Sequence, residues 1–360
     1  MKKRLVALTI IFAMVLGLSA CSNSNPPSSS DAASDTTPAT SASSEASQTA
    51  SPSSNEWSPT KSIKAVIGYA AGGSTDSIMR PLFSVAESII GQTIVVENTA
   101  GGSGSISFND GMMAAADGYT LIIGAETPAL YDAYDLIEYT YNDVIPILVS
   151  AENANYVFVA ADSPYQTIEE MFNAELANPG SVLKVASGTV GVNATVSAIF
   201  KHIVGVDFEA YTADSASSAV VTVMGGFADY GLGAMSTVQD YVANGDVRIL
   251  CSLSPERLQD DIPTICEYYP EMAEYLPINA FYTICVRADT DQVVVDYYTE
   301  VFQEAWNSKE YQEVLTNLGL IPLGAVGDEA REYVDGFRER ALTVLTSTGA
   351  VEYTMQELGY

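Results

Sequence analysis

Apolar and polar residues recur with different periods along the chain, and the changes of period mark the predicted elements. Residues 63–69 are almost entirely apolar or aromatic, which favours a short buried strand. Apolar side chains then recur every three or four positions over residues 77–90, which predicts a helix that ends at Gly91. Pro81 lies near the predicted start of this helix, where its missing N–H group costs little.

The alternation of strand and helix continues along the chain. We predict strands at 93–96 and 121–123, with a helix at 106–116 between them. Strands that alternate with helices are typical of a parallel sheet, whose ligands bind beside the carboxyl ends of the strands. The predicted fold class is therefore α/β.

A glycine turn joins the first predicted strand to the first predicted helix. It reads Ala70-Ala71-Gly72-Gly73-Ser74-Thr75-Asp76, with Ser74 as the predicted N-cap. A helix that starts directly after a strand aims unpaired N–H groups and the positive end of its dipole at one point, which favours an anion site. Turns of this kind also occur for tight packing alone, and the segment by itself does not separate the two interpretations.

The second half of the chain repeats this arrangement. A predicted strand at 183–186 runs into Ser187-Gly188-Thr189-Val190-Gly191-Val192-Asn193, and a predicted helix follows at 194–204. We interpret the β-rich segments 156–160 and 281–286 as strands that cross between two lobes. The predicted lobe 1 comprises residues 61–156 and 281–360, including helices at 293–318 and 328–346, and the predicted lobe 2 comprises residues 157–280.

The N-terminal region is predicted to be a signal and a tether. Residues 1–21 begin with three basic residues, continue with an apolar run too short to span a membrane, and end in Leu-Ser-Ala-Cys, which resembles a bacterial lipoprotein box. We expect Cys21 to be acylated and to become the first residue of the mature protein. The alternative is a cleaved secretory peptide that happens to end in Cys. Residues 22–60 are rich in Ser, Thr, Ala and Pro, which predicts a flexible tether spanning roughly 30–40 Å.

Composition excludes several classes of function. The formal net charge of −30 makes nucleic acid a poor partner. The chain has one His, no Gly-x-Ser-x-Gly, no His-Glu-x-x-His and no phosphate-binding loop, so we expect no enzymatic activity, no cofactor and no metal. Cys251, Cys266 and Cys285 form no metal-binding pattern, and we expect buried thiols with one disulfide possible.

The order and spacing of short motifs resemble the TctC or Bug family, the extracytoplasmic solute-binding proteins of tripartite tricarboxylate transporters. The resemblance covers residues 63–360. It rests on Val66 to Asp76, Arg80-Pro81-Leu82, Gly91-Gln92, Val95 to Asn98, Ala100 to Gly104, Ala116 to Leu121, Asn178 to Ser181, Ala186 to Gly191, Gly225 to Asp229, Gly245 to Leu250, Ser254 to Arg257, Ile262 to Glu267 and Leu318-Gly319.

The resemblance implies a two-lobed periplasmic-binding-protein type II fold, in which each lobe is a mostly parallel sheet flanked by helices. It also implies a receptor that closes on a small carboxylate-bearing solute and delivers it to the membrane subunits of the transporter. We expect a monomeric lipoprotein on the extracytoplasmic face of the cell membrane. The alternatives are a lipid-anchored surface or adhesion protein and, less in keeping with the residues, an exported hydrolase.

The chain departs from the family pattern in the second turn. Many members carry a His at the start of the second helix, where this chain has Asn193-Ala194-Thr195, and this leaves the identity of the solute open. The family motif Val-Pro-Tyr-Lys-Gly is reduced to residues 210–214 and has lost its Lys. Asp214 is expected to be a solvated loop carboxylate, whereas Asp229 matches a family position.

Our hypothesis is that backbone N–H groups of the two turns hold the solute carboxylate, with hydroxyl and amide side chains beside them. Arg80 either touches the anion or forms a structural ion pair, and Asp76 either touches the solute through water or caps its helix. Of the two polar residues after the third strand, we expect Thr127 rather than Glu126 to contact the solute. The candidate ligand-binding residues are Tyr69, Ala71, Gly72, Gly73, Ser74, Thr75, Asp76, Thr127, Ser187, Gly188, Thr189, Gly191, Asn193, Tyr211 and Asp229.

Overall fold

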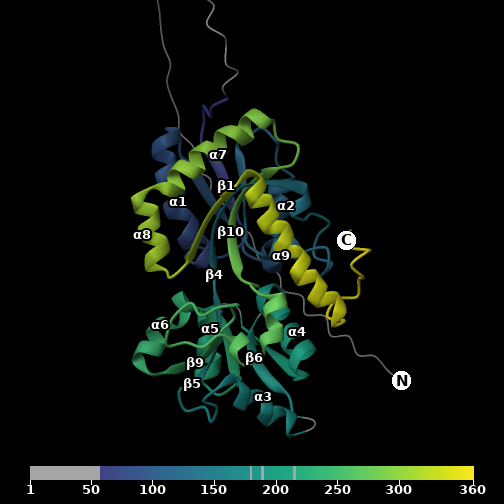
Figure 1. The fold of residues 1–360 in the computed structure, drawn as a ribbon. Coiled ribbons are helices and arrows are strands. Elements are labelled where there is room, and N and C mark those ends of the chain that lie inside the picture. Colours follow the sequence, from purple (N-terminus) through teal and green to yellow (C-terminus); the bar gives the residue numbers. More distant parts are fainter. Residues whose placement is uncertain (1–56, 179–180, 188–189, 214–215) are drawn as a thin grey trace, which may run out of the picture. The chain divides into compact units, whose positions relative to one another are not determined.

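The fold is built on two β-sheets, each covered by helices on both faces (Figure 1). The structure is a computed structural model that describes residues 57–178, 181–187, 190–213 and 216–360. Both sheets belong to one unit of the chain, Ser53–Tyr360. We use lobe 1 for the six-stranded sheet with its helices and lobe 2 for the five-stranded sheet with its helices.

The sheet of lobe 1 has the strand order β11-β4-β10-β3-β1-β2. Its strands are β1 (Ile63–Ile67), β2 (Ile94–Asn98), β3 (Thr120–Gly124), β4 (Val144–Asn153), β10 (Ala280–Arg287) and β11 (Ile321–Val326). Its helices are α1 (Ser74–Ile90), α2 (Ser105–Met112), α7 (Gln292–Asn307), α8 (Lys309–Asn317) and α9 (Gly327–Ser347).

Alternate residues of β1 show how this sheet is buried. Ile63, Ala65 and Ile67 pack in one apolar cluster with residues of α1, α7 and α8. Val66 points to the other face and joins a second cluster with α2 and α9. Since side chains alternate across a strand, a strand buried on both faces reads as a nearly continuous apolar run. Residues 63–67 follow this pattern except at Lys64, which is partly exposed and pairs with Glu97.

The sheet of lobe 2 has the strand order β7-β6-β8-β5-β9. Apolar residues of α5 and α6 pack on one face, and those of α3 and α4 pack on the other. Its elements are β5 (Asn155–Ala160), α3 (Ile168–Leu176), β6 (Leu183–Ser187), α4 (Val192–Val204), β7 (Phe208–Thr212), α5 (Ala216–Met224), β8 (Tyr230–Ala234), α6 (Met235–Asn244) and β9 (Val247–Ser252). Short 3-10 helices lie at Gly102–Gly104, Thr127–Leu130, Tyr141–Asp143, Ile265–Glu267 and Pro270–Tyr275.

The predicted two-lobed α/β fold is confirmed, with a difference in the sheets. Strands β1, β2 and β3 run parallel, as do β6, β7 and β8. The strands on which the chain passes between the lobes pair antiparallel with their neighbours. Both sheets are therefore mixed rather than mostly parallel, because these strands run against the strand–helix–strand repeats.

Several predicted boundaries differ from the structure. Helix α1 begins at Ser74 with Gly73 as its N-cap, so the prediction of Ser74 as the N-cap is wrong. Pro81 consequently lies about two turns inside the helix, farther from its start than predicted. The helix predicted over 293–318 is interrupted at Ser308, whose extended backbone ends α7 and whose side chain caps α8.

The three cysteines of the folded region are free thiols. Cys251 and Cys285 are buried, whereas Cys266 is partly exposed, so the expectation of buried thiols holds for two of the three. The burial of Cys251 and Cys285 raises the pKa of each thiol, to about 12 in the case of Cys285.

Trp57, the first residue that the structure describes, docks on the folded body. Its ring makes edge contacts with Tyr119, Tyr297 and Tyr298, at centroid distances of 5.8, 5.3 and 5.4 Å. Gly118 leaves room for it, because a Cβ atom at that position would lie 2.7 Å from the indole. Trp57 thereby anchors the first described residues on lobe 1.

Replacing Trp57 by Ala should destabilise the protein by about 2 kcal/mol, less than a fully buried aromatic residue would, because the indole is only partly covered. Urea denaturation followed by circular dichroism measures this change. Trp57→Phe, which keeps most of the edge contacts, is the matched control and should lose less than half as much. Equal losses for the two variants would contradict the packing role of the indole.

Candidate functional site

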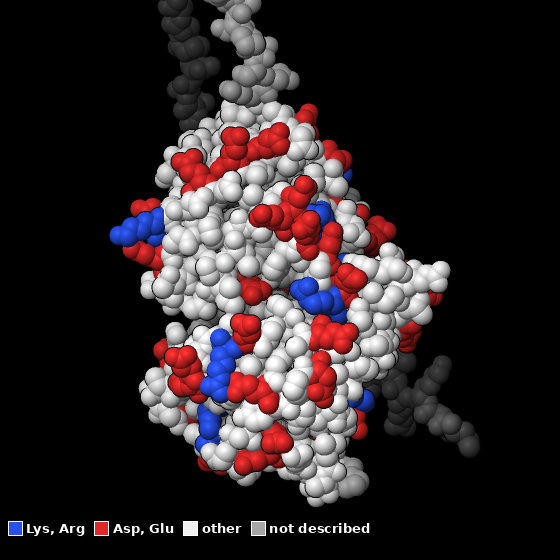
Figure 2. All heavy atoms as spheres, in the orientation of Figure 1, with Lys and Arg blue, Asp and Glu red and all other residues white. Residues whose placement is uncertain are grey.

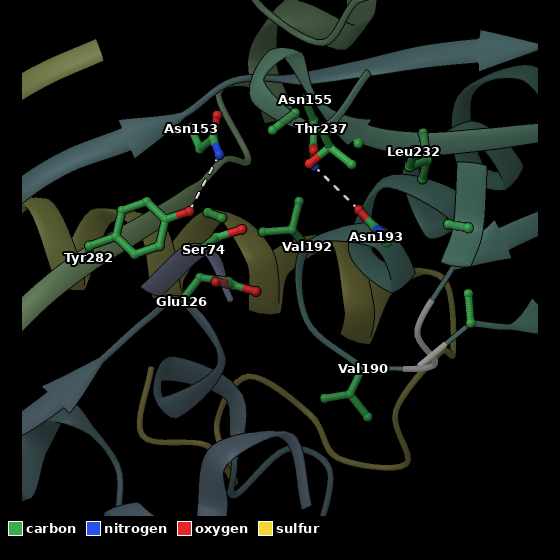
Figure 3. A pocket seen from close by; sticks show the side chains of 15 residues that line it. Ser74, Glu126, Asn153, Asn155, Val190, Val192, Asn193, Leu232, Thr237 and Tyr282 are labelled. Carbon is green, nitrogen blue, oxygen red and sulfur yellow. Dashed lines mark hydrogen bonds between the residues drawn. The ribbon is translucent and has the colours of Figure 1, made fainter. Parts of the chain in front are cut away.

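Two adjoining cavities lie where the lobes meet, with volumes of about 260 and 470 Å³. Both are lined by Ser74, Glu126, Thr237, Ala280 and Tyr282, so they form one continuous site. This total is in the range of small-molecule sites, which usually lie between domains. Figure 3 shows the smaller cavity and the polar side chains that surround it.

The lobe 1 wall of the site is the turn between β1 and α1. Gly72 has a left-handed φ of 76°, and the N–H group of Gly73 donates to the Ala70 carbonyl at 3.0 Å. The next three backbone N–H groups, of Ser74, Thr75 and Asp76, donate to no residue that the structure describes. These groups belong to the first turn of α1, where no helical partner exists, and Ser74 and Thr75 line the cavity.

Asp76 holds this turn in place. Its carboxylate accepts hydrogen bonds from the Gly72 N–H group at 2.9 Å, from Arg80 Nη2 at 2.5 Å and from Asn98 Nδ2 at 3.0 Å. Burial acts to raise the pKa of Asp76, but the hydrogen bonds from Arg80, Gly72 and Asn98 outweigh it and hold the pKa below its ordinary value. Arg80 thus forms an ion pair with Asp76. Of the two roles considered for Arg80 from the sequence, this is the structural one.

The lobe 2 wall is the turn before α4. Gly191 has a φ of 87°, and α4 begins directly after it at Val192. Asn193 lies in the first turn, where its Oδ1 atom accepts a hydrogen bond from Asn155 Nδ2 at 3.3 Å. Gly188 and Thr189 fall outside the described residues, as do Asp214 and Cys21.

Glu126 reaches from lobe 1 to the start of α4. It follows β3, and its carboxylate accepts a hydrogen bond from the Val192 N–H group. A Cβ atom at Gly191 would lie only 3.0 Å from Glu126 Oε1, which shows how closely the carboxylate approaches this turn. Burial raises the pKa of Glu126, and the hydrogen bonds from backbone N–H groups and Thr127 oppose that effect.

Tyrosine hydroxyls complete the polar lining. Tyr69 Oη and Thr127 Oγ1 form a hydrogen bond at 3.2 Å, and burial raises the pKa of Tyr69. Tyr282 accepts from Asn153 Nδ2 at 3.4 Å, and burial raises its pKa to about 12. No Lys, Arg or His side chain lines either cavity in the part of the chain that the structure describes. The wall therefore offers neutral donors and acceptors and one acidic side chain.

The structure brings together part of the predicted set of ligand-binding residues. Those that line the cavities are Tyr69, Gly72, Gly73, Ser74, Thr75 and Asn193. Thr127 and Gly191 lie just behind the wall, where Thr127 meets Tyr69 and Gly191 meets Glu126. Ala71 is exposed at the tip of the turn, Asp76 is buried beneath it, and Ser187 ends β6.

Two predicted residues lie away from the cavities. Tyr211 is 45% exposed and packs beside Phe227, with ring centroids 6.2 Å apart. The carboxylate of Asp229 accepts from the Lys184 N–H group at 2.7 Å and ties the start of β8 to β6. Asp229 precedes β8, so it lies at the opposite end of the parallel strands from the turn before α4.

The sequence analysis missed several lining residues. Asn153 and Asn155 flank the point where the chain passes from β4 to β5, and Ala280 and Tyr282 begin β10. The available signal was a short polar stretch, Glu152-Asn153-Ala154-Asn155, between two apolar runs. Thr237 in α6 carried no signal that distinguishes it from a surface residue.

The fold and the cavity define an extracytoplasmic solute-binding protein, with its site between two lobes. The sequence matches the family described as "TctC: Tripartite tricarboxylate transporter family receptor" over residues 78–346, and the chain belongs to this family. It is therefore a receptor of the solute-binding type and not an enzyme, as predicted.

Known relatives cover most of the chain. Protein BugT of Bordetella pertussis is 25% identical over 308 residues, which are 84% of this chain and 93% of BugT. Rpa4515 of Rhodopseudomonas palustris, solved with adipate, is 21% identical, with a TM-score of 0.72 over 81% of this chain and 98% of that one. MatC of the same organism, solved with malate, is 19% identical, with a TM-score of 0.67 over 79% and 99%. The two structures share the fold.

Replacing Asp76 by Asn should lower the free energy of unfolding by about 1–2 kcal/mol at pH 7, since the exposed side of the Arg80 pair is screened by solvent. The pKa of Asp76 is lowered in the folded state, so its contribution is present at neutral pH and is lost as the pH falls below its ordinary value of 3.8.

Denaturation curves of both proteins at pH 7 and pH 3 test this pH dependence. The difference between wild type and Asp76→Asn should shrink at pH 3. Glu300→Gln, at an exposed site on α7, is the control and should leave stability unchanged at both pH values. A difference that stays constant from pH 7 to pH 3 would rule out a charged Asp76 as the group that holds the turn.

Proposed function

We propose that this receptor binds a small carboxylate-bearing solute between its lobes and delivers it to the membrane subunits of a tripartite tricarboxylate-type transporter. The observation that carries the proposal is the row of three unpaired N–H groups at the start of α1, beside the cavity. Oriented backbone donors and the helix dipole favour an anion at that point. The adipate and malate in the solved structures of Rpa4515 and MatC support a carboxylate as the ligand.

The charge of the protein makes the attraction local. The chain carries 45 acidic and 15 basic residues, and Figure 2 shows acidic side chains spread over the visible face. An anion in solution gains nothing from this surface at long range. Inside the cavity, hydrogen bonds to a charged group contribute roughly 1.5–3 kcal/mol each, so three to five of them are enough for micromolar binding.

We propose further that the protein is a lipoprotein, held at the extracytoplasmic face of the membrane by lipid on Cys21. The support is the sequence Leu-Ser-Ala-Cys after an apolar run, followed by the polar segment 22–60. Among the described residues, no helix combines the length and apolarity needed to cross a membrane.

A thermal-shift screen of the full-length protein tests the proposed ligand class. The panel comprises mono-, di- and tricarboxylates, amino acids and neutral sugars. A ligand at 100 times its dissociation constant adds about 2.7 kcal/mol of stability. We expect a rise in melting temperature with at least one carboxylate and none with sugars. A response to sugars alone, or to nothing in the panel, would favour the surface-protein alternative.

Replacing Gly73 by Val should abolish solute binding and leave the fold intact. A Cβ atom at Gly73 would lie 3.0 Å from the Ala70 carbonyl oxygen, so a branched side chain displaces the turn that presents the N–H groups. Titration calorimetry with the solute from the screen measures the loss. Ser88→Val, on the exposed face of the same helix, is the matched control and should bind normally. Unchanged affinity in Gly73→Val would remove this turn from the site.

Replacing Cys21 by Ser should release the protein from the membrane fraction, because a hydroxyl cannot take the place of the acylated sulfur. Fractionation of expressing cells and immunoblotting measure the distribution. Cys266→Ser, at the partly exposed cysteine of lobe 2, is the control and should stay with the membrane. A Cys21→Ser variant that still sediments with membranes would exclude the lipid anchor.

A further inference from the structure

The acidic side chain of Glu126 lies in the wall of a cavity that we propose to bind an anion. It lines both cavities and comes from the segment directly after β3. No basic side chain of the described residues lines these cavities to neutralise it. Its carboxylate accepts hydrogen bonds from its own backbone N–H group, from that of Val192 at the start of α4, and from Thr127 Oγ1 at 3.4 Å, none of which carries a positive charge. A purely anionic solute would therefore meet a like charge.

The contact with Val192 also assigns different roles to the two helix starts. The first N–H group of α4 already donates to the protein's own carboxylate. The first three N–H groups of α1 have no partner among the described residues. The solute carboxylate is thus left with the α1 side of the cavity, and Glu126 occupies the α4 side.

A second acceptor lines the same cavity. Asn153 is 3% exposed, and its Nδ2 atom donates to Tyr282 Oη at 3.4 Å. Its Oδ1 atom is buried and has no hydrogen-bond partner in the described residues. A buried acceptor without a donor is costly, and a ligand that donates to it removes that cost. Figure 3 shows Asn153 and Glu126 among the side chains around this cavity.

From these placements we propose that the solute carries an ammonium group as well as a carboxylate, as an amino acid does. The carboxylate binds the unpaired N–H groups at the start of α1. The ammonium group donates to the Glu126 carboxylate, which has no basic side chain beside it among the described lining residues, and to Asn153 Oδ1, which has no donor there. Three N–H bonds on one cation suit two such acceptors. Glu126 and Asn153 are then the residues that select an amino acid over the acid that lacks the amino group.

The inference rests on the proposed function, because it needs a carboxylate in the same cavity. Burial raises the pKa of Glu126, and an ammonium group at hydrogen-bond distance favours the charged form of this carboxyl. A second carboxylate on the solute has no such effect, since it would face Glu126 without a counter-ion. The polar groups of the cavity wall therefore favour a carboxylate that also carries an ammonium group over one that carries a second carboxylate.

Matched ligand pairs test the inference with the full-length protein. The pairs are aspartate with succinate, glutamate with glutarate, alanine with propionate and phenylalanine with 3-phenylpropionate, each titrated by calorimetry at pH 7. We expect at least one amino acid to bind at least ten-fold more tightly than its deaminated partner. Deaminated acids that bind as tightly as, or more tightly than, their amino acids would overturn the inference and leave the carboxylate receptor standing. Failure of both members of every pair would overturn this inference, and the thermal-shift screen with its tricarboxylates would then decide separately whether the proposed function stands.

Two variants assign the selectivity to these side chains. Glu126→Gln keeps an oxygen acceptor for Val192 but loses the charge, and should weaken the amino acid at least ten-fold while leaving the deaminated acid unchanged or tighter. Asn153→Leu removes the other acceptor without touching Glu126, and should also weaken only the amino acid. Glu300→Gln is the control and should leave both affinities unchanged. Melting curves identify any variant that fails to fold, and equal losses for both ligands in a folded variant would contradict the assignment.

Discussion

A helix cannot satisfy the first N–H groups of its own backbone, and α1 begins where these groups meet the cavity. This constraint governs the surrounding structure. Strand β1 lies between β2 and β3 and is buried on both faces, so its end cannot shift. The left-handed Gly72 and the bonds from Gly72, Arg80 and Asn98 to Asp76 then fix how the chain enters the helix. These contacts fix the direction of the first N–H groups of α1, which is the preorganisation that a binding site needs.

The contact between the lobes is also a carboxylate at the start of a helix, but here the carboxylate belongs to the protein. Glu126 belongs to lobe 1 and accepts a hydrogen bond from the first residue of α4 in lobe 2. Its neighbour Thr127 is hydrogen-bonded to Tyr69, which lies at the beginning of the turn after β1. The start of α4 is therefore coupled through two adjacent residues to the start of α1. A bound solute that alters the position of Glu126 would act on both lobes at once, which is how a small ligand can bias the closure of two rigid bodies.

The sequence predicted the fold better than the site, for reasons that particular residues make plain. Strand β1, helix α1 and the C-cap at Gly91 were predictable because local periodicity and glycine chemistry specify them. Strand β4 was not predicted, although it pairs with both β10 and β11, and Pro146 within it is typical of an edge or of no strand. Asn153 was missed with it. Tyr211 and Asp229 were assigned to the site from the family resemblance. Asp229 precedes β8 and so lies at the other end of the parallel strands, whereas Tyr211 pairs with Ala186 near the carboxyl end of β6 but packs beside Phe227 instead of lining the cavities.

The acidic surface of the protein does not prevent an anion from binding in a cavity that lacks basic side chains among its described lining residues, because the surface charges are too far from the cavity to act on the solute. At physiological salt, charges beyond about 8 Å are screened, so the surface carboxylates in Figure 2 matter little to a solute inside the cavity. Backbone N–H groups carry no net charge that a protein must desolvate, and their direction is fixed by the helix. A receptor built this way recognises an anion by the geometry of its donors rather than by attraction to a cation. Among the described residues that line the cavities, the charged side chain is Glu126, and its burial raises its pKa. Electrostatic selectivity in this cavity is therefore concentrated at one position of the wall.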